Sequence, residues 1–190
     1  MVASQRVPTL ALVVTALSLI CITAASGHPS DEKPDLNSIS GEDLKDLTVK
    51  LERTACRGDC PAYSLTIRGD GRVEYDGQNY VKEKGSRQGQ VEVDRVKTLI
   101  SEFAKANFFS LPEEYSDARC RGYCSHMPTV ITELSLRGAT HRVKHYHGCI
   151  GVPKTLFDLE DAIDKLANAE QWTGDVSKTG PVSTGCTGVN

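Results

Sequence analysis

Cysteine content constrains the fold of this chain more than any other feature of its sequence. The chain has 7 cysteines in 190 residues, and Cys21 lies in an apolar N-terminal segment, which leaves an even number in the remainder. An even number of cysteines in an exported chain predicts a disulfide framework. We therefore expect these structural disulfide cysteines: Cys56, Cys60, Cys120, Cys124, Cys149 and Cys186.

Two cysteine pairs share one local form, in which three residues with a central glycine separate the sulfurs. The glycine permits the tight backbone that a short ring needs. Sequence alone does not determine how the cysteines connect. The pairing that we expect is Cys56–Cys60, Cys124–Cys149 and Cys120–Cys186.

Three other roles for these cysteines have weaker support in the sequence. A four-cysteine zinc site competes with disulfide formation, which an oxidising compartment favours. Thiol–disulfide oxidoreductases usually have two residues between their cysteines beside a helix start, whereas a strand follows here. Arg57-Gly58-Asp59 matches a cell-adhesion motif, but the second ring also contains Arg-Gly, so this dipeptide belongs to the turn.

Residues 1–27 have the layout of a signal peptide. Arg6 precedes an apolar run from Val7 to Ala25, which small residues end. Cleavage after Ala25 or Gly27 would leave the mature chain in the periplasm or outside the cell. An uncleaved anchor is the alternative, because the run is nearly long enough to span a bilayer. No later run is as long, so we expect no membrane span in the mature chain.

Composition indicates one folded domain with tails. The net charge is −3 with 39% hydrophobic residues, which suits a core and lacks the basic excess of a nucleic-acid-binding protein. We divide the chain into a signal peptide (1–27), a flexible polar linker (28–46), a single α+β domain (47–172) and a Gly/Ser/Thr-rich tail (173–190).

Apolar periodicity predicts the elements of this domain. Residues 47–52, 63–68 and 73–75 alternate as strands, with turns at 69–71 and 76–77, and Tyr80 starts a further short strand before a polar loop at 85–90. A helical period follows from Val96 to Phe103. A cysteine-bearing loop (112–128), a hairpin (130–147) and a second helix from Pro153 complete the order. This order predicts an α+β fold, an antiparallel β-sheet with two helices packed on one face.

Several motifs resemble a bacterial exported family, the domain of unknown function 6438. The resemblance rests on Cys56-Arg-Gly-Asp-Cys60-Pro61-Ala-Tyr63, on Tyr75-Asp76-Gly77 and on the helix that ends in Phe108-Phe109-Ser-Leu111. It covers about residues 47–172. It implies this fold and export, and it transfers no catalytic residue. One departure is His126, where the family often has an acidic residue.

The best chemical candidate is a row of histidines on the second strand of the later hairpin. His141, His145 and His147, with Cys149, share one face of a regular strand and would suit zinc or copper. Val143 lies on the same face, which also suits core packing. A cysteine–histidine hydrolase at Cys149 would need a free thiolate. The carboxylates at 113, 114 and 117 fit a solvated loop better than a glycosidase cleft.

The sequence thus predicts an exported, disulfide-stabilised, non-catalytic module that binds a protein, peptide or cell-envelope component and needs no cofactor. The alternative is a zinc- or copper-binding protein that uses His141, His145 and His147.

Overall fold

The computed structural model of the chain describes residue 1, residues 33–175 and residues 186–187. The predicted signal peptide beyond Met1, the first part of the predicted linker and most of the predicted tail lie outside the described residues. The structural unit considered below begins at Lys33. Within the described residues, no helix is both long and apolar enough to cross a membrane.

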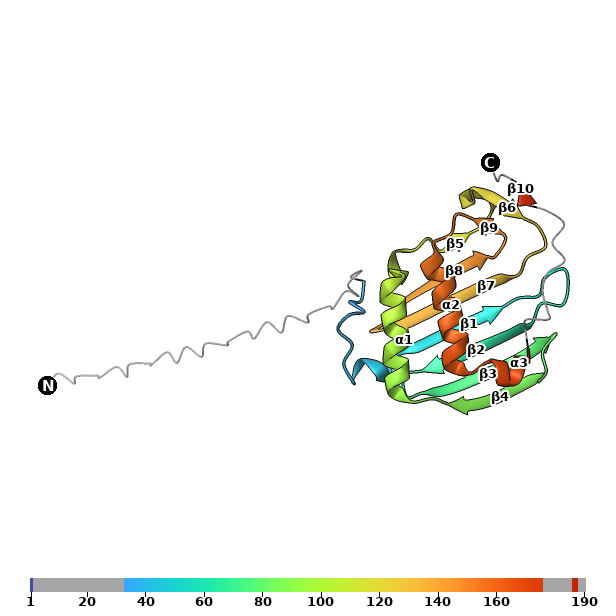
Figure 1. The fold of residues 1–190 in the computed structure, drawn as a ribbon. Helices are drawn as coiled ribbons and strands as arrows, with labels where there is room; N and C mark the ends of the chain where they lie inside the picture. Colours follow the sequence, from blue (N-terminus) through green and yellow to red (C-terminus); the bar gives the residue numbers. More distant parts are fainter. Residues whose placement is uncertain (2–32, 176–185, 188–190) are drawn as a thin grey trace. The chain divides into compact units, whose positions relative to one another are not determined.

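A sheet of seven strands forms one layer of this unit, in the order β4-β3-β2-β1-β7-β8-β5 (Figure 1). Neighbouring strands run antiparallel, except for β5 and β8, which are parallel. The pairing of β1 with β7 joins the first four strands to the later hairpin. The strands are β1 (Thr48–Arg53), β2 (Ala62–Arg68), β3 (Arg72–Asn79), β4 (Gly85–Gln90), β5 (Glu114–Tyr115), β7 (Thr129–Leu136) and β8 (Ala139–Tyr146).

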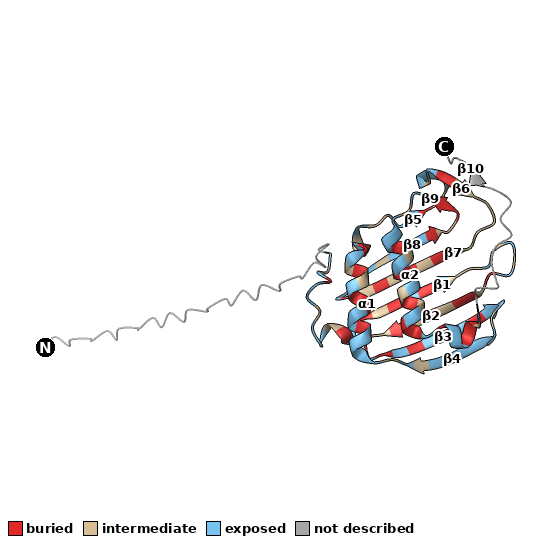
Figure 2. Ribbon diagram, in the orientation of Figure 1, coloured by how far each residue is buried: buried red, intermediate tan, exposed pale blue. Residues whose placement is uncertain are grey.

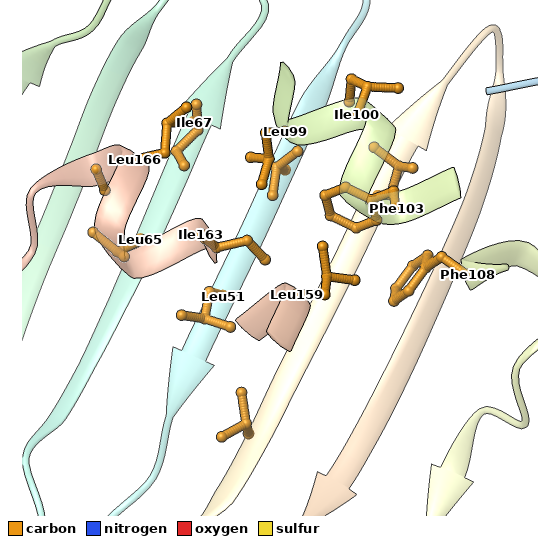
Figure 3. Close-up of a cluster of buried hydrophobic side chains, with 14 of the residues drawn as sticks. Leu51, Leu65, Ile67, Leu99, Ile100, Phe103, Phe108, Leu159, Ile163 and Leu166 are labelled. Carbon is orange, nitrogen blue, oxygen red and sulfur yellow. The ribbon is translucent and has the colours of Figure 1, made fainter. Parts of the chain in front are cut away.

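Two helices, α1 (Val93–Lys105) and α2 (Lys154–Ala167), lie across one face of this sheet (Figure 1). Their buried residues recur every three or four positions and pack onto the buried alternate residues of the strands. Figure 3 shows these side chains between the two layers, among them Leu51, Phe103 and Leu159. The predicted α+β fold with disulfides is therefore confirmed.

Smaller elements close the two ends of the core. The short helix α3 (Glu170–Thr173) carries Trp172, whose ring stacks on Tyr75 at a centroid distance of 5.0 Å. Within the predicted linker, Leu36 and Leu44 are buried against the core. Leu44 lies in a 3-10 helix, η1 (Asp43–Lys45), and two further 3-10 turns are η2 (Phe108–Ser110) and η3 (Asp117–Arg119).

The β3–β4 hairpin differs from its prediction. We expected a turn at Asp76-Gly77 and a polar loop at 85–90, whereas β3 continues through this dipeptide and β4 occupies the loop. Tyr80 lies in the connection and not in a strand. Glycine is required because a Cβ atom at Gly77 would lie 2.1 Å from the carbonyl oxygen of Glu83. Strand β4 lacks apolar alternation because it is an edge strand with both faces largely exposed (Figure 2).

A second, three-stranded sheet has its middle strand in the segment 112–128, where the sequence predicted a cysteine-bearing loop. The middle strand pairs antiparallel with one strand on each side. The order is β10-β6-β9, and the strands are β6 (Gly122–Cys124), β9 (Cys149–Ile150) and β10 (Cys186–Thr187).

One expected disulfide is present, and another joins a pair that we did not expect. Cys56 is bonded to Cys60, as the short ring predicted. Cys120 is bonded to Cys149, with Cα atoms 5.0 Å apart, whereas we expected Cys149 to pair with Cys124. Both other expected pairs, Cys124–Cys149 and Cys120–Cys186, are therefore wrong.

The register of the second sheet explains this difference. Cys149 lies opposite Tyr123, and successive side chains of a strand point to opposite sides, so Cys124 points away from Cys149. Cys124 is itself disulfide-bonded. In the pairing of β6 with β10, it lies opposite Cys186. Sequence spacing contains no information about this strand register.

Candidate functional site

A row of polar residues crosses the main sheet at the end of β1. Tyr63 of β2 lies opposite Arg53 of β1, Arg53 lies opposite Val130 of β7, and Val130 lies opposite His145 of β8. Residues paired in this way point to the same face, which here is the face covered by the helices. Tyr63 is 4% exposed and His145 is 0% exposed, so polar groups are buried at this end of the core.

Helix α2 supplies two carboxylates to this row. Glu160 and Asp164 are four residues apart and therefore lie on one side of the helix, one turn from each other. Asp164 accepts hydrogen bonds from the Arg53 Nε atom at 2.8 Å and from the Tyr63 hydroxyl at 2.8 Å. The Arg53 Nη2 atom lies 2.6 Å from the same carboxylate. This half of the row is a hydrogen-bonded ion pair beneath the helix.

Glu160 forms the other half of the row with two histidines. The His145 Nδ1 atom lies 2.8 Å from one oxygen of Glu160, and the His147 Nε2 atom lies 2.8 Å from the other. The two imidazole rings are 4.6 Å apart between centroids, and the Phe157 ring meets His145 edge-on at 4.4 Å. One potential ligand atom from each of the three residues lies within 4.8 Å of the others.

The charge of Glu160 determines which ring nitrogens carry hydrogen. Burial opposes ionisation of this carboxyl, but the hydrogen bonds from His145 and His147 outweigh burial and hold its pKa below the usual value. An ionised carboxylate only accepts hydrogen bonds, so His145 donates from Nδ1 and His147 donates from Nε2. In the same row, burial and the negative charge of Asp164 raise the pKa of Tyr63, which stays neutral and donates.

The second nitrogen of His145 makes no hydrogen bond within the described part of the chain. Its Nε2 atom is buried and has no hydrogen-bond partner among the described residues. Buried polar atoms without partners are uncommon, and the Thr132 hydroxyl is another within the described residues. His147 connects the cluster to solvent, because its side chain is 20% exposed while that of Glu160 is 1% exposed.

The structure brings together two of the three predicted histidines. His145 and His147 meet on Glu160, whereas His141 lies four residues before His145, about 13 Å along an extended strand. The His141 Nε2 atom donates a hydrogen bond to the Leu111 carbonyl oxygen at 3.0 Å. Cys149 is consumed by its disulfide, so neither a metal–thiolate bond nor a cysteine hydrolase can use it.

Glu160 is the residue that the sequence interpretation missed. It follows Leu156 by four positions and precedes Ile163 by three, so it lies on the buried stripe of α2. A carboxylate inside an apolar stripe was the available signal, because such a group is buried only with partners.

Comparison with known proteins adds a family but no activity. The chain matches a family described as a domain of unknown function (DUF6438) over residues 47–167, which includes every residue of the polar row. None of the curated proteins matches the chain.

Proposed function

The chain belongs to the DUF6438 family, and we propose that it is an exported, disulfide-stabilised domain that binds a transition-metal ion, zinc or copper, through His145, His147 and Glu160. The observation that carries this proposal is the position of three potential ligand atoms within 4.8 Å of one another. They come from two strand-end histidines and one helix carboxylate.

The donor set has the right chemistry for such an ion. Two imidazoles and one carboxylate are a common set of three protein ligands for zinc, and imidazole also suits copper. Glu160 supplies a negative charge, because its pKa is lowered. An ion would replace the hydrogens that now link Glu160 to the rings, and metal binding would release protons.

The same contacts also fit a competing interpretation, in which they only stabilise the fold as a buried polar network. The orphaned Nε2 atom of His145 does not decide between the two interpretations, because an ion that replaced the hydrogen on Nδ1 would also leave Nε2 without a partner. The partial exposure of His147 provides a way in for an ion.

The wider prediction of a module that binds a protein, peptide or cell-envelope component has less support. We expected such a module to expose a contiguous apolar patch. Among the described residues, the exposed large apolar side chains are Met1, Tyr80 and Val93, and the last two lie beyond opposite ends of strand β4. We therefore place the metal first.

Export is part of the proposal and rests on two observations. Residues 1–27 have the charge and apolar pattern of a signal peptide. The disulfides Cys56–Cys60 and Cys120–Cys149 require an oxidising compartment in most organisms.

The test uses the chain expressed with its own leader and purified without an affinity tag. Its mass reports whether the leader has been cleaved after Ala25 or Gly27. Calorimetric titration with zinc and copper chlorides reports affinity and stoichiometry. His147→Ala should lower the affinity more than about 100-fold, since even outer-shell partners contribute 10–100-fold.

The matched control is His141→Ala, because His141 lies in β8 on the same face as His145 but bonds to Leu111. It should bind metal as the unaltered chain does. Equal affinity of the His147 and His141 variants, or no binding by the unaltered chain, would show that the cluster is not a metal site. An uncleaved leader would contradict release of the mature chain and favour the membrane-anchored alternative.

A further inference from the structure

His147 is held differently from the other two members of the cluster. His145 lies within β8 and is paired with Val130 on one side and Tyr115 on the other. Glu160 lies in the interior of α2. His147 follows the end of β8, in the short connection to β9, where the main sheet no longer pairs with the chain.

Backbone contacts of this connection all lead to the small sheet and to the segment before β7. The His147 N–H donates to the Pro128 carbonyl oxygen at 2.9 Å. The Gly148 carbonyl oxygen accepts from the Cys124 N–H at 2.8 Å, and the Ile150 carbonyl oxygen accepts from the Arg121 N–H at 2.8 Å. The position of His147 therefore depends on residues 120–128.

The connection is also tightly packed at Gly148. A Cβ atom there would lie 2.0 Å from the Cys124 carbonyl oxygen and 2.3 Å from the Tyr146 ring. The Tyr146 hydroxyl donates to that same carbonyl oxygen at 2.8 Å and accepts from the Met127 N–H at 3.1 Å. A displacement of residues 120–127 would therefore displace the backbone beside His147.

A disulfide bond also links this connection to the segment that contacts it. Cys149, two residues after His147, is bonded to Cys120 and is 4% exposed. Strand β9 has two residues and β6 has three, and pairing of that length is not stable by itself. The disulfide is thus the strongest constraint between the connection and the segment that holds it.

We infer that the Cys120–Cys149 disulfide is a positioning crosslink, which holds His147 on Glu160 and thereby sets the affinity of the proposed metal site. The statement about affinity rests on the proposed function. The statement about position does not, because it concerns the His147–Glu160 hydrogen bond itself.

The experiment compares two double variants of the full chain. Cys120→Ala/Cys149→Ala removes the crosslink, and Cys56→Ala/Cys60→Ala is the matched control, because each disulfide has one buried and one partly exposed cysteine. Nuclear magnetic resonance of the histidine rings in metal-free protein reports the His147–Glu160 hydrogen bond. Zinc titration then reports the affinity.

We expect the first variant to lose the His147 ring signal of the bonded state, to keep that of His145, and to bind zinc about 10–100-fold more weakly. The control should retain both ring signals and the affinity. An unchanged His147 signal in the first variant, or equal changes in the two variants, would overturn the inference.

A second variant covers the case in which removal of the crosslink prevents folding. Gly148→Ala keeps every cysteine but forces a Cβ atom toward the Cys124 carbonyl oxygen, so it should shift the His147 signal and not that of His145. A His147 signal that stays in place would again refute the inference. If the unaltered chain binds no zinc, the proposed function fails, and the ring signals alone still decide the positioning role.

Discussion

Substituting alanine for Asp164 removes the acceptor at the centre of the polar row. The carboxylate pairs with Arg53 at 2.6 Å and accepts from Tyr63 at 2.8 Å. Removing one partner of a fully buried ion pair costs about 3–5 kcal/mol. The Arg53 and Asp164 side chains are still 17% and 20% exposed. We therefore reduce the ionic contribution to about 2 kcal/mol and add about 1 kcal/mol for the Tyr63 hydroxyl.

The expected destabilisation of Asp164→Ala is thus about 3 kcal/mol, which corresponds to a melting temperature lower by about 6–12 °C for a domain of this size. Urea unfolding at pH 7 measures it, with the fluorescence of Trp172 as the probe, because it is the single tryptophan and is buried. The double variant Arg53→Met/Asp164→Leu should recover most of this loss, since apolar replacement of both partners is often neutral.

The control pair is Lys50 and Glu133, which are 2.9 Å apart on the open face of the sheet with side chains 54% and 21% exposed. Glu133→Ala should cost at most about 1 kcal/mol, because solvent screens an exposed pair. Equal costs for Asp164→Ala and Glu133→Ala would refute the argument that burial under α2 strengthens the polar row.

Two further predictions concern stability. Because the pKa of Glu160 is lowered on folding, its ionised form stabilises the protein above the unfolded pKa near 4.5, and this contribution disappears as pH falls through the folded pKa. In thermal melts, the advantage of the unaltered chain over Glu160→Gln should therefore shrink from pH 6 to pH 3, and a constant gap would contradict this. Leu159→Ala should cost about 2–5 kcal/mol in urea unfolding, because Leu159 is 0% exposed between the layers, and a loss below about 1 kcal/mol would show that the core adjusts.

The sequence predicted those elements that bury one face. In strands β1 and β7, buried residues alternate with exposed or partly buried ones, and helix α1 has buried residues at intervals of three and four. Their periods are therefore visible in the residue order. Strand β4 has no such period, because it lies at the edge of the sheet and buries neither face. Its assignment depends on pairing with β3, which is a tertiary contact.

The sequence predicted only part of the site, and the reason is related. Strand periodicity placed His141, His145 and His147 on one face, but a shared face says nothing about separation along the strand. Metal ligands must converge on one point. Here the third potential ligand is Glu160, which lies on α2, a helix that follows β8 after a short connection. The cysteine pairing failed because it depends on the register of β6 and β9, which the spacing of cysteines does not encode.

The central pairing of β1 with β7 has a consequence for the order of folding. Strands β1 to β4 follow one another as hairpins and can form from nearby residues, and β7 and β8 form another hairpin. Joining the two across β1 and β7 closes a loop of more than 70 residues, which is entropically slow compared with hairpin formation. Arg53 and Tyr63 belong to the first group of strands and His145 to the second, so the polar row comes into existence only when this long-range step is complete. A nascent chain would therefore complete the polar row last.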